Sequence, residues 1–145
     1  MMAAAAPSRP YTVLLAEDDL GDALLIEEAF LVRGLGQDLQ MVSDGVDAMA
    51  YLRDPARRRP DLIILDLNMP RMDGRETLAA IKSDPELRMI PVVVLTTSDA
   101  PDDVSAVYDL RANAYVCKPS ELDDFLGTVH AIDDFFLDLI RRARP

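Results

Sequence analysis

The chain is predicted to be a single α/β domain, in which helices cover both faces of a five-stranded parallel sheet. Three short apolar runs, at residues 11–16, 62–65 and 92–95, do not alternate with polar residues. Runs of this kind are typical of strands that are buried on both faces. Segments with helical spacing of apolar residues lie between these runs, and this alternation predicts a doubly wound parallel sheet with right-handed connections.

Weaker patterns complete the set of elements. Two further runs, at residues 39–42 and 114–117, bring the strands to five. The first helix is indicated by a stripe of apolar residues that ends at two glycines. The stripe consists of Ala23, Ile26, Ala29 and Phe30, and the glycines are Gly34 and Gly36. The other helices are predicted at residues 45–53, 74–82, 102–110 and 121–141.

Length and composition exclude several classes of protein. The 145 residues fit one domain, which we expect at residues 11–145 after a disordered tail at residues 1–10. With 15 lysine and arginine residues against 26 aspartate and glutamate residues, the net charge is −11, which repels nucleic acids and anionic membrane surfaces. No stretch approaches the roughly 18 apolar residues that span a membrane. The single cysteine, Cys117, excludes an internal disulfide and favours a reducing, cytoplasmic location.

Charged and polar residues follow four of the predicted strands, and the carboxyl ends of parallel strands share one edge of the sheet. Glu17 and Asp18 follow the first strand and Asp66 follows the third, so like charges meet there. A hard divalent cation such as Mg²⁺ relieves that conflict, because it prefers oxygen ligands. Asp66 is then the candidate nucleophile toward a phosphoryl group. Thr96 offers a hydroxyl and Lys118 a positive charge to the phosphoryl oxygens.

Four segments together resemble the receiver domain of two-component response regulators, the CheY-like fold. They are VLLAEDD at 13–19, PDLIILDLNMPRMDG at 60–74, PVVVLTTS at 91–98 and AYVCKP at 114–119. The resemblance spans about residues 11 to 141. It implies that Asp66 is the phosphoacceptor and that Glu17 and Asp18 bind the metal, together with the backbone carbonyl of Asn68. It also implies that Thr96 and Tyr115 are switch residues, which repack the surface formed by the fourth helix, the fifth strand and the fifth helix.

A narrower resemblance concerns the stand-alone regulators that are paired with bacterial phytochromes. The segments DGRETLAAIKSDPELRMIPVVVLTTS and EDDLGDALLIEEAF are similar to those regulators, and so is the long connection at residues 51–60. The resemblance implies a phytochrome-type histidine kinase as the phosphoryl donor. Within that connection, Arg57, Arg58 and Arg59 are predicted to form a solvated loop, with contact to a kinase as the alternative.

The residues at the carboxyl ends of the strands are compatible with three functions. The favoured one is a phosphorylation switch that catalyses only its own phosphorylation and dephosphorylation and passes the signal on by protein contact, or acts as a phosphate sink or relay. A phosphorylation-independent adaptor is the second. A phosphatase of the haloacid dehalogenase type is the third, but such enzymes need an acid two positions after the nucleophile, and here that position is Asn68.

The last predicted helix carries more apolar residues than one sheet face needs. A core stripe is expected from Leu122, Phe125, Leu126, Val129, Ile132 and Phe136. Two interpretations of the remaining apolar residues stand: a broad core contact, or an exposed patch that binds a partner. We favour the patch and expect a symmetric homodimer. The predicted interface residues are Phe135, Phe136, Leu139 and Ile140.

Overall fold

The computed structural model contains one parallel sheet with the strand order β2-β1-β3-β4-β5. It describes residues 11–33 and 37–143, except the side chains of residues 137 and 139–143, so the predicted tail and the glycines Gly34 and Gly36 lie outside the described residues. The strands are β1 (Thr12–Ala16), β2 (Asp38–Val42), β3 (Leu62–Leu65), β4 (Val92–Thr96) and β5 (Ala114–Cys117). Every residue of β1, β3 and β4 is buried, whereas the edge strands β2 and β5 are partly exposed. This difference explains why only three of the runs were strongly apolar.

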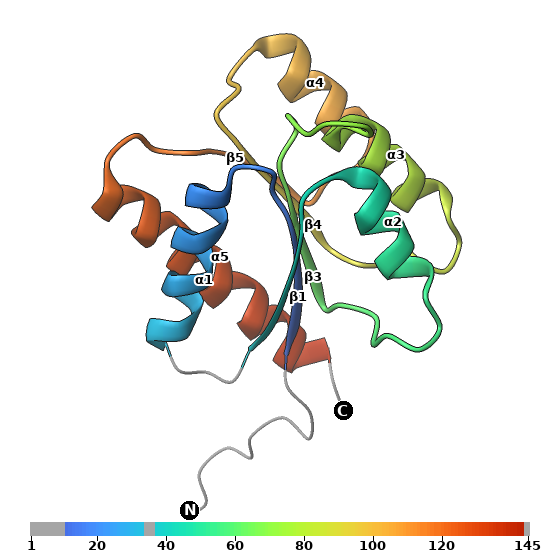
Figure 1. Ribbon diagram of the computed structural model, residues 1–145, viewed down its shortest axis with the longest axis horizontal. Helices are drawn as coiled ribbons and strands as arrows, with labels where there is room; N and C mark the ends of the chain where they lie inside the picture. The colour runs from blue at the N-terminus through green and yellow to red at the C-terminus, as the bar shows by residue number, and fades with distance from the viewer. Residues whose placement is uncertain (1–10, 34–36, 144–145) are drawn as a thin grey trace, which may run out of the picture.

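Helices cover both faces of the sheet, as predicted (Figure 1). They are α1 (Leu20–Arg33), α2 (Gly45–Arg53), α3 (Gly74–Ser83), α4 (Pro101–Asp109) and α5 (Leu122–Ala143). One core cluster joins α1 and α5 to the sheet, and the other joins α2, α3 and α4 to its opposite face. The predicted fold is therefore confirmed. Among the described residues, no helix is both long enough and apolar enough to cross a membrane.

The first turn of α5 differs from the sequence prediction. The helix begins at Leu122, where Glu121 was expected, because the carbonyl of Glu121 accepts the hydrogen bond from the Phe125 amide at 2.9 Å. Leu122 was assigned to the core stripe, but it is 55% exposed. It lines a hollow together with Lys118 and Pro119, which follow the end of β5.

A close backbone contact fixes the loop that follows β3. The amide of Gly74 donates to the carbonyl of Leu67 at 2.9 Å, which folds residues 67–74 back on themselves. A capping box starts α3 at the same place, because the Asp73 side chain accepts from the Glu76 amide and the Glu76 side chain accepts from the Asp73 amide. A Cβ at position 74 would lie 2.2 Å from the carbonyl oxygen of Asp66. Only glycine fits between this helix start and the end of β3.

We therefore predict that Gly74→Ala lowers the free energy of unfolding by about 1–3 kcal/mol, the usual range for overpacking. Gly127→Ala is the matched control, because Gly127 lies within α5 and its Cβ would meet no atom within 4 Å. Alanine favours helix over glycine, so this control should gain up to about 1 kcal/mol. Urea unfolding measures both. Equal effects of the two variants would contradict the tight contact at residue 74.

Candidate functional site

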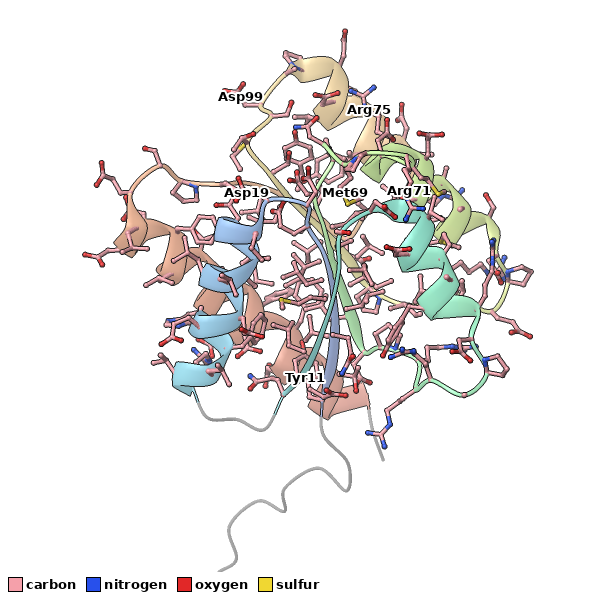
Figure 2. The ribbon with its side chains drawn as sticks, in the orientation of Figure 1. Tyr11, Asp19, Met69, Arg71, Arg75 and Asp99 are labelled. Carbon is pink, nitrogen blue, oxygen red and sulfur yellow. The ribbon has the colours of Figure 1, made fainter. Side chains whose placement is uncertain are left out.

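Three carboxylates meet at the carboxyl edge of the sheet. Glu17 and Asp18 follow β1, Asp66 follows β3, and these strands are hydrogen-bonded neighbours. The Asp66 amide continues the ladder by donating to the Ala16 carbonyl at 3.0 Å. One oxygen of each carboxylate lies within 4.8 Å of the others. Glu17 and Asp66 are buried, while Asp18 is exposed. In Figure 2, Asp19 and Met69 mark this edge, because each lies close in sequence to one of these carboxylates.

Lys118 places one positive charge among these carboxylates. Its amide donates to the Thr96 carbonyl at 2.7 Å, which holds the residue directly after β5. The ammonium donates to Glu17, to Asp22 at 2.9 Å and to Asp66 at 3.2 Å, and its side chain is only 4% exposed. Burial by itself lowers the pKa of Lys118, but the hydrogen bonds to Asp22 and Glu17 and the charge of Asp66 raise the pKa overall. Lys118 therefore stays charged at neutral pH.

One ammonium does not balance the carboxylates around it. Burial, followed by a hydrogen bond with Asp66, raises the pKa of Glu17 to about 8 overall, against the lowering effect of Lys118. Without another cation, Glu17 retains a proton that it shares with Asp66. Carboxylate oxygens this close together suit a hard divalent cation. The residues that could hold it are Glu17, Asp18 and Asp66.

Asp22 belongs to this site, although the sequence analysis did not select it. It lies in the first turn of α1 and contacts the Lys118 ammonium. A signal was present in the sequence: a helix that follows the first strand directly brings its first turn to the same edge as the end of that strand. The acidic residue in that turn could have been assigned to the site on this ground.

The predicted switch residues, Thr96 and Tyr115, both contact the backbone of Ser98. Thr96 is fully buried at the end of β4, and its hydroxyl oxygen accepts from the Ser98 amide at 3.4 Å. The Tyr115 hydroxyl donates to the Ser98 carbonyl, and its half-buried ring packs against the core beneath α4. The structure therefore brings Thr96 and Tyr115 to one short segment. Their movement on phosphorylation stays a prediction.

Asn68 contacts Asp66 through its backbone N–H. This amide donates to an oxygen of the Asp66 carboxylate at 3.4 Å, and the Asn68 side chain is exposed. The contact orients the Asp66 carboxylate. Metal binding through the Asn68 carbonyl stays a prediction.

The segment after β4 is also tied to α3 and α4. The Ser98 hydroxyl donates to Asp103 in the first turn of α4, and Asp103 pairs with Arg75 near the start of α3. Arg75, labelled in Figure 2, lies beside α4. These contacts could not be predicted from the sequence, because no spacing rule links a residue of α3 to a residue of α4. Ser98 is therefore held through its amide, its hydroxyl and its carbonyl.

A second arginine fixes the loop after Asp66 from the other side. Arg71 adopts a positive φ of 63°, and its guanidinium donates to Asp44 at 2.6 Å and to Asp47 at 3.0 Å. The hydrogen bond from Arg71 holds the pKa of the Asp44 carboxyl below its ordinary value. Asp44 also caps α2 by accepting from the Asp47 amide at 2.8 Å. The start of α2 and the loop after β3 are therefore joined by side-chain contacts.

The predicted interface on α5 is only partly exposed. Phe135 is 64% exposed and packs edge-to-face on Phe136, with ring centroids 5.0 Å apart. Phe136 itself is buried with Phe125, Val129 and Ile132. Its assignment to an exposed interface is therefore wrong for this structure, because its position on the helix faces the sheet. The side chains of Leu139 and Ile140 lie outside the described residues.

Comparison with known proteins agrees with this geometry. The sequence model of the response regulator receiver domain matches residues 13–130. The chain therefore belongs to the response regulator receiver family, and the predicted CheY-like resemblance is confirmed.

Similar proteins include phytochrome response regulators. The response regulator Rcp1 of Synechocystis sp. is 43% identical over 135 residues, which cover 90% of this chain and 92% of Rcp1. The crystal structure of the phosphorylated cyanobacterial phytochrome response regulator RcpA superimposes with a TM-score of 0.85 at 45% identity, covering 88% of this chain and 94% of RcpA. The Mn²⁺-bound form of Rcp1 gives a TM-score of 0.84 at 44% identity, covering 88% of this chain and 95% of that one. The predicted resemblance to regulators that are paired with phytochromes is therefore confirmed as a similarity of sequence and of structure.

We predict a pH dependence of stability that comes from Glu17. Its pKa is about 8 in the folded chain against 4.5 as the ordinary value, so its stabilising contribution is complete below about pH 4.5 and is lost as the pH rises through about 8. In metal-free buffer, this loss should reach the order of a few kcal/mol.

Urea unfolding in the presence of EDTA, measured at several values across this pH range, checks the prediction. Glu17→Gln should flatten the dependence, because glutamine carries no titrating proton. Glu28→Gln, at an exposed position of α1, is the control and should retain it. An unchanged slope in Glu17→Gln would contradict the assignment to Glu17.

Proposed function

We propose that this chain accepts a phosphoryl group on Asp66, with Mg²⁺ as the metal, from the phosphohistidine of a sensor kinase. The observation that carries this proposal is the surroundings of the Asp66 carboxylate. It lies at the end of a central strand, 3.2 Å from the Lys118 ammonium and within the oxygen cluster formed with Glu17 and Asp18. Carboxylates gathered in this way repel one another unless cations accompany them, and a phosphoryl group is commonly bound together with such a cation.

In the proposed step, an oxygen of Asp66 attacks the phosphorus atom and the phosphorus–nitrogen bond breaks. The histidine keeps the bonding electrons and leaves as neutral imidazole, because its other ring nitrogen already carries a proton. The backbone N–H of Asn68 orients the attacking carboxylate of Asp66. The Lys118 ammonium faces the phosphoryl oxygens, which become more negative during the transfer. When bound, Mg²⁺ supplies further positive charge to the phosphoryl oxygens. Hydrolysis of the resulting acyl phosphate returns Asp66 to its carboxylate.

The signal is proposed to leave through Thr96 and Tyr115. Thr96 lies at the end of the strand next to β3, and its hydroxyl has one backbone contact, to the Ser98 amide. A bound phosphoryl oxygen would accept a hydrogen bond from this hydroxyl, and a rotation of Thr96 toward it would loosen the contact with Ser98, whose carbonyl accepts from Tyr115. The rearrangement then reaches the surface formed by α4, β5 and α5.

The donor is proposed to be a phytochrome-type histidine kinase. The support is the similarity to Rcp1 and to RcpA, a phytochrome response regulator, over nearly the whole length of those chains. Phosphotransfer from a purified phytochrome kinase should be faster than transfer from an unrelated histidine kinase at equal concentrations. Equal rates would remove this pairing and leave the chemistry at Asp66 untouched.

We also propose that the chain acts only on its own phosphoryl group. Phosphatases that use a nucleophilic aspartate need a nearby acid to protonate the leaving group. The position two residues after Asp66 carries the amide of Asn68, which cannot supply that proton. The chain is therefore expected to turn over small phosphate esters no faster than buffer does.

Phe135 supports the proposal of a homodimer formed through α5. Its exposed ring lies beside an apolar hollow of about 410 Å³ between β5 and α5, which includes Val116 and Ile132 in its lining. We predict that Phe135→Ser lowers the mass measured by light scattering from that of a dimer to that of a monomer. Met89→Ser, in the loop before β4 and 81% exposed, should leave the mass unchanged. A monomeric parent protein at high concentration, with and without a phosphoryl mimic, would contradict this interface.

The prediction that tests the main proposal is the position of the added phosphoryl group. Incubation with acetyl phosphate and Mg²⁺ should add one phosphoryl mass to the chain, and borohydride trapping followed by peptide mass spectrometry should locate it at Asp66. Asp66→Asn should abolish the addition, whereas Asp109→Asn, at an exposed position of α4, should not. Chelation of the metal should slow the reaction strongly. Labelling at another carboxylate, or labelling that persists in Asp66→Asn, would reject Asp66 as the acceptor.

A further inference from the structure

The amino edge of the sheet carries a groove lined by arginines, which the proposed phosphorylation chemistry does not use. The groove lies between the α2–β3 connection and the α3–β4 connection and has a volume of about 510 Å³. We call it the arginine groove. Its cationic residues are Arg53, Arg57, Arg58 and Arg59, and its acidic residues are Asp54, Asp84 and Glu86.

The charge of this groove contrasts with the rest of the protein. Its residues sum to 4 − 3 = +1, whereas the rest of the chain sums to (15 − 4) − (26 − 3) = −12. All four arginines are exposed. A chain that is acidic elsewhere therefore concentrates positive charge at one hollow.

The acidic residues of the groove leave much of this positive charge free. Asp54 accepts from the Ala56 amide at 2.9 Å, and Asp84 accepts from the Glu86 amide at 2.9 Å, so both stabilise turns. The ion pairs Arg57–Asp54 at 3.7 Å and Arg59–Glu86 at 3.8 Å are long and exposed, and such pairs contribute little. Among the described residues, the side chains of Arg53 and Arg58 pair with no carboxylate.

The loop that carries these arginines is held in place. The guanidinium of Arg57 stacks 5.0 Å above the centre of the Tyr51 ring, and the Tyr51 hydroxyl donates to the Arg58 carbonyl at 3.5 Å. The Arg57 amide closes a turn on the Asp54 carbonyl at 3.1 Å, and Pro60 is buried at the end of the loop. Little backbone freedom is then lost when a ligand binds, which favours affinity.

We propose that the arginine groove binds an acidic segment of a partner protein. Guanidinium groups bind carboxylates with two parallel hydrogen bonds, and the exposed fork of Arg58 is free to do so. The occupant must be short, because a long polyanion such as a nucleic acid would extend onto the acidic remainder of the surface and be repelled. An acidic peptide segment of a few residues fits both the size of the groove and its local charge.

The position of the groove separates this binding from phosphorylation. Connections that lead into β3 and β4 lie at the amino ends of the strands, while Asp66 follows the carboxyl end of β3 (Figure 1). A partner held in the arginine groove leaves the opposite edge open. Binding is then the same in the unphosphorylated and phosphorylated protein, and the groove serves as a constant tether.

In the test, the full chain is titrated with a short, end-blocked peptide of glutamate and aspartate. Binding is measured by calorimetry and by backbone amide NMR. Shifts should concentrate at residues 51–60 and 84–88. The triple variant Arg57→Gln, Arg58→Gln, Arg59→Gln should bind at least about tenfold more weakly, as expected for the loss of charge-assisted contacts. Arg111→Gln, which removes an exposed arginine elsewhere, should bind like the parent protein.

Two further measurements keep the result specific. Arg58→Lys retains the charge but not the planar fork, so it should weaken binding less than the triple variant does. Labelling of the triple variant by acetyl phosphate should match the parent protein, which shows that the fold and the chemistry at Asp66 are intact. No binding of the peptide at low salt, equal binding to the triple variant, or tighter binding of phosphatidylserine vesicles or a single-stranded oligonucleotide to the same arginines would overturn the proposal.

Discussion

The structure depends on one electrostatic constraint: carboxylates from the ends of two strands and from the first turn of α1 surround a single buried ammonium. Lys118 contacts Glu17, Asp22 and Asp66 at once, from the end of the edge strand β5. It thereby links residues that are far apart in the sequence and draws the ends of β1, β3 and β5 together. Three carboxylates still face one ammonium, and the pKa of Glu17 is raised chiefly by burial and further by Asp66. An excess of this kind prepares a site for cations and for the groups that cations accompany.

Around this site, the polypeptide is held by contacts that a small change can redistribute. The loop after Asp66 is fixed from one side by Arg71 and from the other by the start of α3 at Gly74. The segment after β4 depends on Ser98, whose polar groups bind Thr96, Tyr115 and Asp103. A new acceptor for the Thr96 hydroxyl that turns this side chain would therefore loosen a hydrogen bond inside this network. In the proposed function, the firm support around Asp66 would hold the phosphoryl group, and the contacts at Ser98 would report its presence.

The sheet also separates two surfaces of opposite charge. Acidic side chains gather at the carboxyl ends of its strands, while the arginines of the arginine groove lie on connections at the amino ends. The buried strands between them are short, but they keep the charges apart by a layer of apolar side chains. The net negative charge of the chain, which repels polyanions, is therefore compatible with a positively charged groove that binds a short acidic ligand.

The sequence by itself determined the order of the elements, because unbroken apolar runs and helical stripes depend only on local spacing. It also predicted that Glu17, Asp18, Asp66, Thr96 and Lys118 would meet, since the carboxyl ends of parallel strands share one edge. Tertiary structure alone decided the partners of Lys118, the contact from Arg75 to Asp103, and the exposure of Leu122 against the burial of Phe136. Those features depend on how helices distant in the sequence pack against one sheet, and periodicity within a helix does not contain that information.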